Sequence, residues 1–311
     1  MGALRGKVVV VTGAAGGIGG AICRLLAAEG ARLVVNDLGC DWDGEGEDPS
    51  VAAAVAADLT ASGAEVVALS GDTTRPDVAE ALVATAVRHW GRLDGVVNAA
   101  GTLRDWMFHN IPLEDWQHLL GIHLTGPFLL GQAACRHWRA EAGEGRPVAG
   151  RIVNTTSVAG LLGNPGQSCY SAAKAGVAAL TRVVAMEMAP YNVTVNAIAP
   201  SARTRMTENS TALPDADPTW DLLSPDNTAP LVAYLLTDAA APITGQIFGV
   251  FADVIELYEG WTPTAVAHNG TPWTLPTIHT RLPDLFTHHP RSYTGPLTTP
   301  AMTALFGPDN T

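Results

Sequence analysis

Cysteine is scarce in this chain and is never clustered. Of 311 residues only four are cysteine, and no two of them form a C-x-x-C pair or lie near a histidine at metal-ligand spacing. The sequence therefore predicts neither a disulfide scaffold nor a metal site. Cysteines kept apart in this way favour a reducing, cytoplasmic compartment.

Long apolar runs are also missing. The first apolar run, residues 8–11, stops at Thr12, which is too short for the core of a signal peptide. No stretch approaches the roughly 18 apolar residues of a membrane span, and the final residues are not a peroxisomal address. We therefore expect a cytoplasmic protein with no membrane association.

Basic residues are outnumbered by acidic ones. Lys and Arg total 18 against 30 Asp and Glu, which gives a formal net charge of -12 at pH 7. A surface of that sign repels phosphate backbones, so no nucleic-acid partner is expected. The 47% of apolar residues is ordinary for a globular protein and argues against disorder.

Apolar strand-like runs alternate with Ala- and Leu-rich helical stretches as far as about residue 250. This alternation predicts a single α/β domain with a doubly wound, Rossmann-type, seven-stranded parallel sheet. The expected strands are residues 7–12, 32–36, 65–69, 95–98, 151–155, 194–198 and 246–251. The expected helices are residues 17–29, 50–62, 76–90, 113–140 with a break near 121–127, 170–188 and 229–237.

The composition changes after Trp261 to proline, threonine and histidine with little periodicity. We therefore divide the chain into a domain at residues 1–260 and an irregular C-terminal arm at residues 261–311. Apolar residues in the arm predict that it packs on its own subunit or on a neighbour.

A glycine-rich loop joins the first strand to the first helix. Gly13, Gly17, Ile18 and Gly19 lie in this loop, in a T-G-x-x-x-G-x-G pattern. Glycines let the backbone approach a pyrophosphate, and the helix N-terminus offers free N–H groups to it. The loop predicts a dinucleotide site.

Asp37 directly follows the second strand, about twenty residues after the glycines. A carboxylate there can accept hydrogen bonds from the adenosine ribose and would repel a 2′-phosphate, so the sequence favours NAD over NADP. The alternative is that Asp37 only caps the turn before Gly39.

Tyr170 and Lys174 are four positions apart at the start of an expected helix, so they project from one face. An ammonium group near a phenol favours the phenolate and lowers its pKa. Lys174 is one of only two lysines in the chain, the other being Lys7. Ser157 lies just after the end of the fifth strand, at the sheet edge where such folds place their ligands, so the three side chains can converge.

These residues together resemble the short-chain dehydrogenase/reductase family over residues 5 to about 255. The resemblance rests on the glycine loop, Asp72, the run Asn98-Ala99-Ala100-Gly101, Ser157, and Tyr170 with Lys174. It implies that Tyr170 is the acid/base, that Ser157 binds the substrate oxygen and that Lys174 holds the nicotinamide ribose. It further implies that Asp72, Asn98, Gly101 and Pro200 support the cofactor, and that the protein forms a homodimer or homotetramer.

Two positions depart from the usual family pattern and indicate a subgroup. His123 stands where the family usually has a catalytic Asn, and Pro200-Ser201 replaces Pro-Gly. With the Arg205-Met206-Thr207 run, these resemble the (3R)-hydroxyacyl-CoA dehydrogenase part of peroxisomal multifunctional enzyme type 2 and its bacterial single-domain relatives. His123 would then take the place of this Asn, which in the family anchors a water molecule that relays protons.

We therefore expect an NAD-dependent oxidoreductase that transfers a hydride between a small-molecule secondary alcohol or ketone, such as a 3-hydroxyacyl thioester, and nicotinamide. The acidic loop at residues 40–48 lacks the basic residues that a CoA phosphate would need. One alternative is therefore a tailoring ketoreductase acting on a polyketide or other secondary metabolite. Another is a cofactor-binding scaffold or sensor without redox activity.

Overall fold

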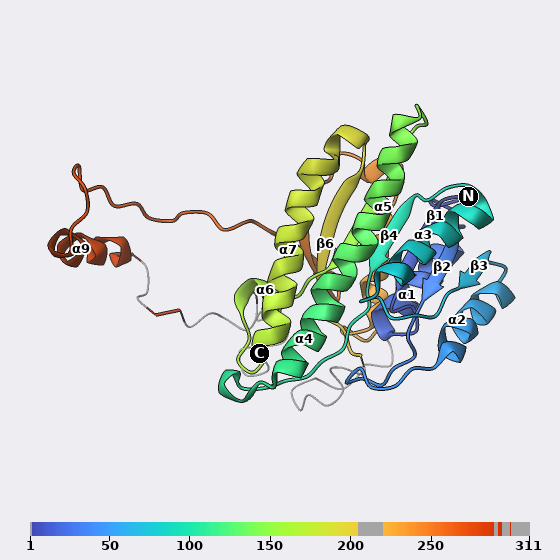
Figure 1. Ribbon diagram of the computed structural model, residues 1–311, viewed down its shortest axis with the longest axis horizontal. Coiled ribbons are helices and arrows are strands. Elements are labelled where there is room, and N and C mark those ends of the chain that lie inside the picture. Colours follow the sequence, from blue (N-terminus) through green and yellow to red (C-terminus); the bar gives the residue numbers. More distant parts are fainter. Residues whose placement is uncertain (1, 205–219, 289–291, 294–298, 300–311) are drawn as a thin grey trace.

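A single mixed sheet forms the centre of the molecule, with helices on both faces (Figure 1). The computed structural model describes residues 2–204, 220–288, 292–293 and 299. The strand order is β3-β2-β1-β4-β5-β6-β7-β8, and the first seven strands are parallel, as the sequence predicts. The strands are β1 (Val8–Thr12), β2 (Arg32–Asn36), β3 (Val66–Ala68), β4 (Gly95–Asn98), β5 (Arg151–Thr155), β6 (Thr194–Pro200), β7 (Ile247–Phe251) and β8 (Val254–Tyr258).

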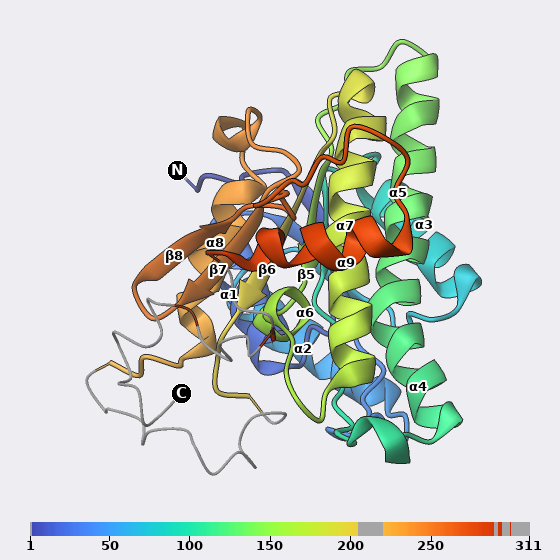
Figure 2. The same ribbon diagram turned by 90° about the vertical axis from the view of Figure 1, so that its left-hand side faces the viewer.

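The helices form two layers around this sheet. They are α1 (Gly17–Ala28), α2 (Pro49–Ala61), α3 (Pro76–Trp90), α4 (Leu113–Leu120), α5 (Gly126–Gly143), α6 (Val158–Leu162), α7 (Ser168–Met188), α8 (Ala229–Leu235) and α9 (Leu275–Arg281). Helices α1, α2 and α8 cover one face, and α3, α5 and α7 cover the other (Figure 2). Within the described ranges, no helix has the length and apolar character to cross a bilayer.

The central strand β1 shows why the sheet is covered twice. Val9 and Val11 pack toward the α1 and α8 layer, whereas Val8 and Val10 pack toward α3 and α5. All four valines are at most 1% exposed. A strand buried on both faces is a continuous apolar run, which is the pattern that the sequence shows.

The expected seventh strand is followed by an eighth that the sequence analysis missed. Strand β8 returns antiparallel to β7, with Phe251 opposite Val254. The two residues between them include Ala252 at φ 48°, a left-handed conformation that usually goes to Gly or Asn. Asp253 is a usual turn residue, but Ala252 stands where Gly or Asn is expected, so the hairpin has only a weak sequence signal.

The long helix expected at residues 113–140 is divided, as predicted. A π-helical turn, Gly121–Thr125, separates α4 from α5. Such turns insert one extra residue per turn and are frequent at functional sites.

The C-terminal arm leaves the body after β8 and carries α9 away from it (Figure 1). The arm was expected to be irregular, but α9 is helical because Thr274 and Thr277 form a capping box and Pro276 lies in the first turn. The arm then returns to the body, where the Tyr293 hydroxyl donates to the Leu162 carbonyl at 2.7 Å. Trp261 and Leu275 are 93% and 80% exposed, so this part of the arm does not pack on its own subunit.

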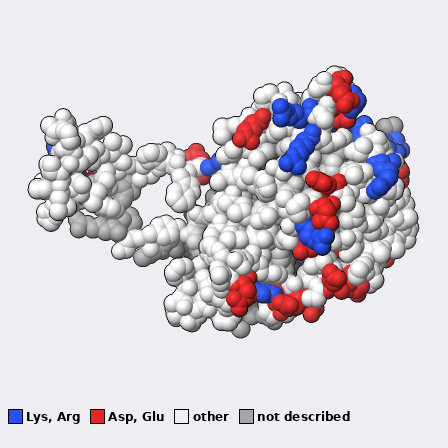
Figure 3. Space-filling model, in the orientation of Figure 1, with Lys and Arg blue, Asp and Glu red and all other residues white. Residues whose placement is uncertain are grey.

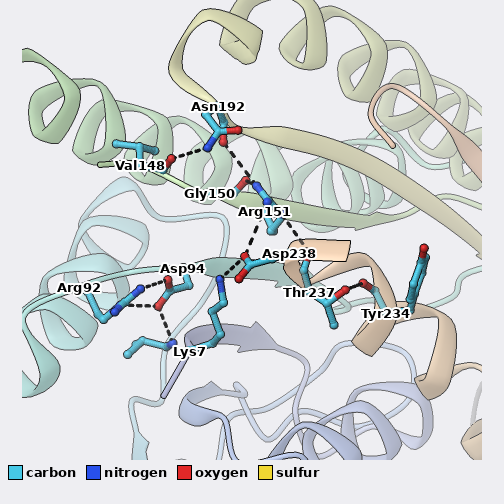
Figure 4. Close-up of polar contacts among 11 residues, drawn as sticks. Lys7, Arg92, Asp94, Val148, Gly150, Arg151, Asn192, Tyr234, Thr237 and Asp238 are labelled. Atoms are coloured by element: carbon cyan, nitrogen blue, oxygen red, sulfur yellow. Dashed lines mark hydrogen bonds and ion pairs between the residues drawn. The ribbon is translucent and has the colours of Figure 1, made fainter. Parts of the chain in front are cut away.

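The amino ends of the strands are closed by polar contacts around Arg151 (Figure 4). Arg151 is 2% exposed and donates to the carbonyls of Gly150 at 2.9 Å and Asn192 at 3.4 Å. Asp94 accepts from the Val8 N–H at 2.8 Å and pairs with Arg92. These contacts hold the end of the sheet that faces away from the site.

Candidate active site

A cavity of about 450 Å³ opens at the carboxyl ends of the parallel strands. Ser157, Tyr170, Lys174 and His123 all line it. The predicted cofactor residues on its walls are Gly13, Gly17, Ile18, Gly19, Asp37, Asp72, Gly101 and Pro200. The fold therefore gathers almost every predicted site residue around one space, at the edge where open α/β sheets bind ligands.

The glycine loop is packed so closely that side chains would not fit. A Cβ atom on Gly19 would lie 2.0 Å from the Gly13 carbonyl oxygen, and one on Gly13 would lie 2.6 Å from the Ala100 Cα. Gly13 also has a φ of 66°, which favours glycine. No side chain caps α1 at Gly16, so the first N–H groups of the helix remain available to a ligand. This cradle fits a pyrophosphate.

Asp37 performs the turn role that was the alternative interpretation and also faces the cavity. One carboxylate oxygen accepts from the Gly39 N–H and the other from the Ala15 N–H, both at 2.9 Å. Each oxygen has a second lone pair, so these two bonds leave acceptor capacity for ribose hydroxyls. The two interpretations of Asp37 are therefore compatible.

Asp72 and Asn98 occupy different positions relative to the cavity. Asp72 lines it and accepts from the Thr74 N–H at 2.8 Å. Asn98 is buried under the floor, where its amide donates to the Asn154 side chain at 2.8 Å. Asn98 thus supports the wall of the site rather than forming it.

Ser157 and Tyr170 come from separate elements that meet at the cavity. Ser157 caps α6, and its hydroxyl accepts from the Ala159 N–H at 3.2 Å. Burial raises the pKa of Tyr170 above its usual value, and a hydrogen bond from Ser157 partly offsets this increase. This differs from the expectation that Lys174 lowers the pKa, because in the structure the burial of the phenol outweighs the other influences on it.

Lys174 lies one helical turn after Tyr170 on α7, with its Nζ 5.6 Å from the centre of the phenol ring. The ammonium donates to the Thr155 carbonyl at 2.7 Å. The residue is 3% exposed, and burial lowers the pKa of the amine to about 7. An amine with that pKa can gain and lose a proton at neutral pH.

His123 comes from the π-helical turn and packs edge-on against Tyr170, with 4.9 Å between the ring centres. Its Nε2 lies 2.7 Å from the Thr102 carbonyl oxygen and 3.3 Å from the Thr102 backbone nitrogen; the shorter contact is to an atom that can only accept, which favours the proton on Nε2. Nδ1 is then an acceptor, and it finds no hydrogen-bond partner among the described residues. Burial, followed by the charge of Lys174, holds the pKa of His123 well below its usual value, so the ring is neutral at pH 7.

Sequence reasoning missed the groups that orient these side chains. The backbone carbonyls of Thr102 and Thr155 fix His123 and Lys174. Backbone carbonyls have no sequence signal because every residue carries one. Gln167 also lines the cavity, and the sequence analysis did not identify it.

The Arg205, Met206 and Thr207 run lies outside the described residues. The described part of the chain contains no cluster of side chains able to hold a metal ion.

Comparisons with known proteins place this site in a family. The sequence model of a protein family described as short chain dehydrogenase matches residues 7–215 of this chain. The chain is 42% identical over 288 residues to hydroxyacyl-CoA dehydrogenase ChsB1 of Mycobacterium tuberculosis, covering 91% of this chain and 89% of that protein. It is 40% identical over 245 residues to peroxisomal multifunctional enzyme type 2 of Mus musculus, covering 79% of this chain and 32% of the relative.

A solved structure extends the same comparison to the fold. A short chain dehydrogenase from Mycobacterium avium is 43% identical, with a TM-score of 0.84, and the match covers 94% of this chain and 98% of that one. The fold and the family that the sequence predicts are thereby confirmed. The chain belongs to the short-chain dehydrogenase family, as an oxidoreductase that uses a nicotinamide cofactor to interconvert CH–OH and carbonyl groups.

Proposed function

We propose that this protein transfers a hydride between NAD and the 3-hydroxy or 3-oxo carbon of an acyl thioester. The observation that carries the proposal is the convergence of Ser157, Tyr170 and Lys174 on the cavity that the glycine cradle borders. A bound nicotinamide supplies or accepts the hydride. The thioester substrate is supported by the relative named hydroxyacyl-CoA dehydrogenase.

Tyr170 is the proton donor and acceptor in this proposal. In reduction its phenol gives a proton to the forming alkoxide, and in oxidation it takes the hydroxyl proton as its own proton passes on toward Lys174 and His123. Ser157 donates a hydrogen bond to the same substrate oxygen and stabilises the negative charge that develops there. The raised pKa of Tyr170 keeps the phenol protonated before reduction.

Lys174 and His123 carry protons to and from Tyr170. The amine of Lys174, with a pKa of about 7, can exchange a proton near neutral pH. The buried Nδ1 of His123 provides an acceptor for a water molecule beside it. His123 thereby takes the place of the family's usual Asn, with the π-helical turn setting its position.

Asp37 selects NAD over NADP. Its carboxylate faces the cavity beside the glycine cradle, where it accepts hydrogen bonds from the ribose hydroxyls and repels a 2′-phosphate. Ile18, Asp72, Gly101 and Pro200 complete the cofactor walls. In this proposal residues 1–260 form the catalytic domain of a cytoplasmic homodimer or homotetramer, and residues 261–311 form its arm.

A free ketone or a carrier-bound polyketide is the second candidate substrate, favoured by the acidic loop. The one guanidinium that reaches this loop within the described residues belongs to Arg104, and it is held by Glu45 and Asp115 at 2.5 and 2.6 Å. Those carboxylates neutralise the charge that a CoA phosphate would need. A tailoring ketoreductase acting on a substrate without CoA would not need a free cation in this loop.

The proposal is tested by comparing the protein with its Tyr170→Phe variant. We expect NADH to bind more tightly than NADPH in fluorescence titrations, and 3-oxoacyl thioesters to be reduced. Tyr170→Phe should lower turnover by about a thousandfold while NADH binding is retained, because only the proton donor is lost. Tyr234→Phe, on α8 and 46% exposed, is the matched control.

Each part of the proposal can fail separately. Preferential binding of NADPH would contradict the role of Asp37. Reduction of free ketones but not thioesters would favour the tailoring reductase. NADH binding without hydride exchange on any carbonyl compound would instead indicate a scaffold or sensor.

A further inference from the structure

Three consecutive large apolar side chains lie exposed just before α4. Trp106, Met107 and Phe108 are 41%, 55% and 75% exposed. We call these three residues the aromatic shelf. Exposed apolar residues that adjoin one another, rather than being scattered, are typical of a binding surface.

The aromatic shelf is held firmly from below. The Trp106 N–H donates to the Gly166 carbonyl at 2.8 Å, and its indole N–H donates to Asp115 at 2.7 Å. The other oxygen of Asp115 accepts from Arg104 at 2.6 Å. The backbone and the indole of Trp106 are thus both fixed, so the start of the shelf has a set position beside the cavity before any ligand binds.

The aromatic shelf is continuous with the catalytic cavity. Leu103 and Gln167 line the cavity, and Gln167 pairs with Trp106 through an isolated β-bridge. The Gln167 amide also donates to Asp105, next to Trp106, at 3.2 Å. A substrate whose oxygen lies on Ser157 and Tyr170 would therefore reach the shelf by passing Gln167.

The charges around the aromatic shelf define what can lie on it. Asp105 and Asp115 flank Trp106, and the nearby cation of Arg104 is paired with Asp115 and Glu45. Figure 3 shows acidic atoms predominating along the lower edge of the face where the chain enters α4. An anionic group would be repelled there, whereas an uncharged apolar chain would bury the exposed side chains.

We propose that the aromatic shelf binds the apolar tail of the substrate, beyond the reacting carbon, and makes the enzyme selective for long or bulky acyl groups. This inference rests on the proposed function, because it places the reacting carbon at Ser157 and Tyr170. The shelf sets chain-length preference and takes no part in the proton transfer.

The test measures binding separately from turnover. Octanoyl and butanoyl thioesters of N-acetylcysteamine, which lack a 3-oxo group, are titrated into the NADH complex by calorimetry. The protein should bind the octanoyl thioester at least about tenfold more tightly, because its longer tail covers the shelf. In the Met107→Ser/Phe108→Ser variant, whose changes are at exposed positions, the preference should fall to about threefold or less. Leu257→Ser, 60% exposed on β8, should keep it.

Equal binding of the two thioesters by the unaltered protein, or an undiminished preference in the double variant, would overturn the inference. A double variant that sediments as a smaller assembly and keeps its preference would also overturn it, since the shelf would then contact a second copy. If the preference behaves as expected but the 3-oxo forms are not reduced, the proposed function fails while the shelf remains a tail-binding surface.

Discussion

Strand β5 has a buried cation at each of its ends, and the two cations have different numbers of hydrogen-bond partners. Arg151 begins the strand and is 2% exposed, whereas Lys174 binds the carbonyl of Thr155, the last residue of the strand, and is 3% exposed. The guanidinium meets the carbonyls of Gly150, Asn192 and Thr237 and lies 4.0 Å from Asp238 (Figure 4). The ammonium has a hydrogen bond to one carbonyl, and the described residues provide it with no carboxylate within ion-pair distance.

The different partners of the two cations show which end of the sheet is stabilised and which is destabilised for the sake of the reaction. Burial lowers the pKa of Arg151 as well, but a guanidinium with several partners stays charged, whereas an ammonium with a single carbonyl partner is poorly compensated. Burial therefore brings the pKa of Lys174 down to about 7, close to the pH at which a proton carrier has to work. The amino end of the sheet stabilises the fold, and the carboxyl end holds reactive groups in a costly environment.

The largest effect on stability should come from the amino end. Arg151→Met would remove the guanidinium donor from the Asn192 carbonyl, while the Gly150 carbonyl would keep only the Thr194 N–H at 3.0 Å, and we expect it to reduce the free energy of unfolding by about 2–3 kcal/mol. Chemical denaturation measures this loss. Arg136→Met, at a 67% exposed site with an ion pair at 4.0 Å, should change it by less than about 0.5 kcal/mol. Equal losses in the two variants would remove the distinction drawn for Arg151.

At the carboxyl end, the corresponding change should have the opposite sign. Lys174→Met should abolish most turnover and increase the free energy of unfolding by about 1–2 kcal/mol, because an incompletely solvated amine is replaced by an apolar side chain.

The pH dependence of that gain follows from the pKa of Lys174. The amine is protonated in the unfolded chain up to its ordinary pKa of about 10.4 but loses its proton near pH 7 in the folded state. Burying the protonated amine therefore lowers the free energy of unfolding of the unaltered protein by its full amount below about pH 7. This loss becomes smaller as the pH rises toward 10. Melting temperatures of the two proteins should differ most at about pH 6.5 and clearly less at about pH 9. A destabilised Lys174→Met protein at both values would contradict the comparison.

The smallest effect should come from the exposed partner of the Arg151 cluster. Asp238 is 75% exposed, and its hydrogen bond from Lys7 lowers the pKa of the carboxyl group. Its stabilising effect is present above the unfolded pKa and is lost as the pH falls through the folded one. Asp238→Asn should cost less than about 1 kcal/mol near pH 7, and the loss should diminish between about pH 5 and pH 3. A loss as large as that of Arg151→Met would show that the carboxylate, and not the carbonyls, compensates the guanidinium.

Much of the site could be predicted because its signals are local in sequence. The glycine cradle and the Tyr170 and Lys174 pair depend on spacing within one loop or one helix, so a short stretch of sequence suffices. Strand β8 was missed because its turn uses Ala252 rather than a typical turn residue. The hydrogen bonds that hold His123 and Lys174 come from backbone carbonyls, which sequence does not mark. The raised pKa of Tyr170 depends on burial, a property of the whole fold.

The central claim, that the cation at the carboxyl end is poised to lose its proton, can be measured directly because the chain has only two lysines, Lys7 and Lys174. Protein labelled with ¹⁵N at lysine Nζ gives two side-chain signals, and Lys7→Arg identifies the one from Lys174. The account predicts that this signal titrates with a pKa of about 7 in the free protein. Titration close to 10, the value of an ordinary lysine, would contradict it.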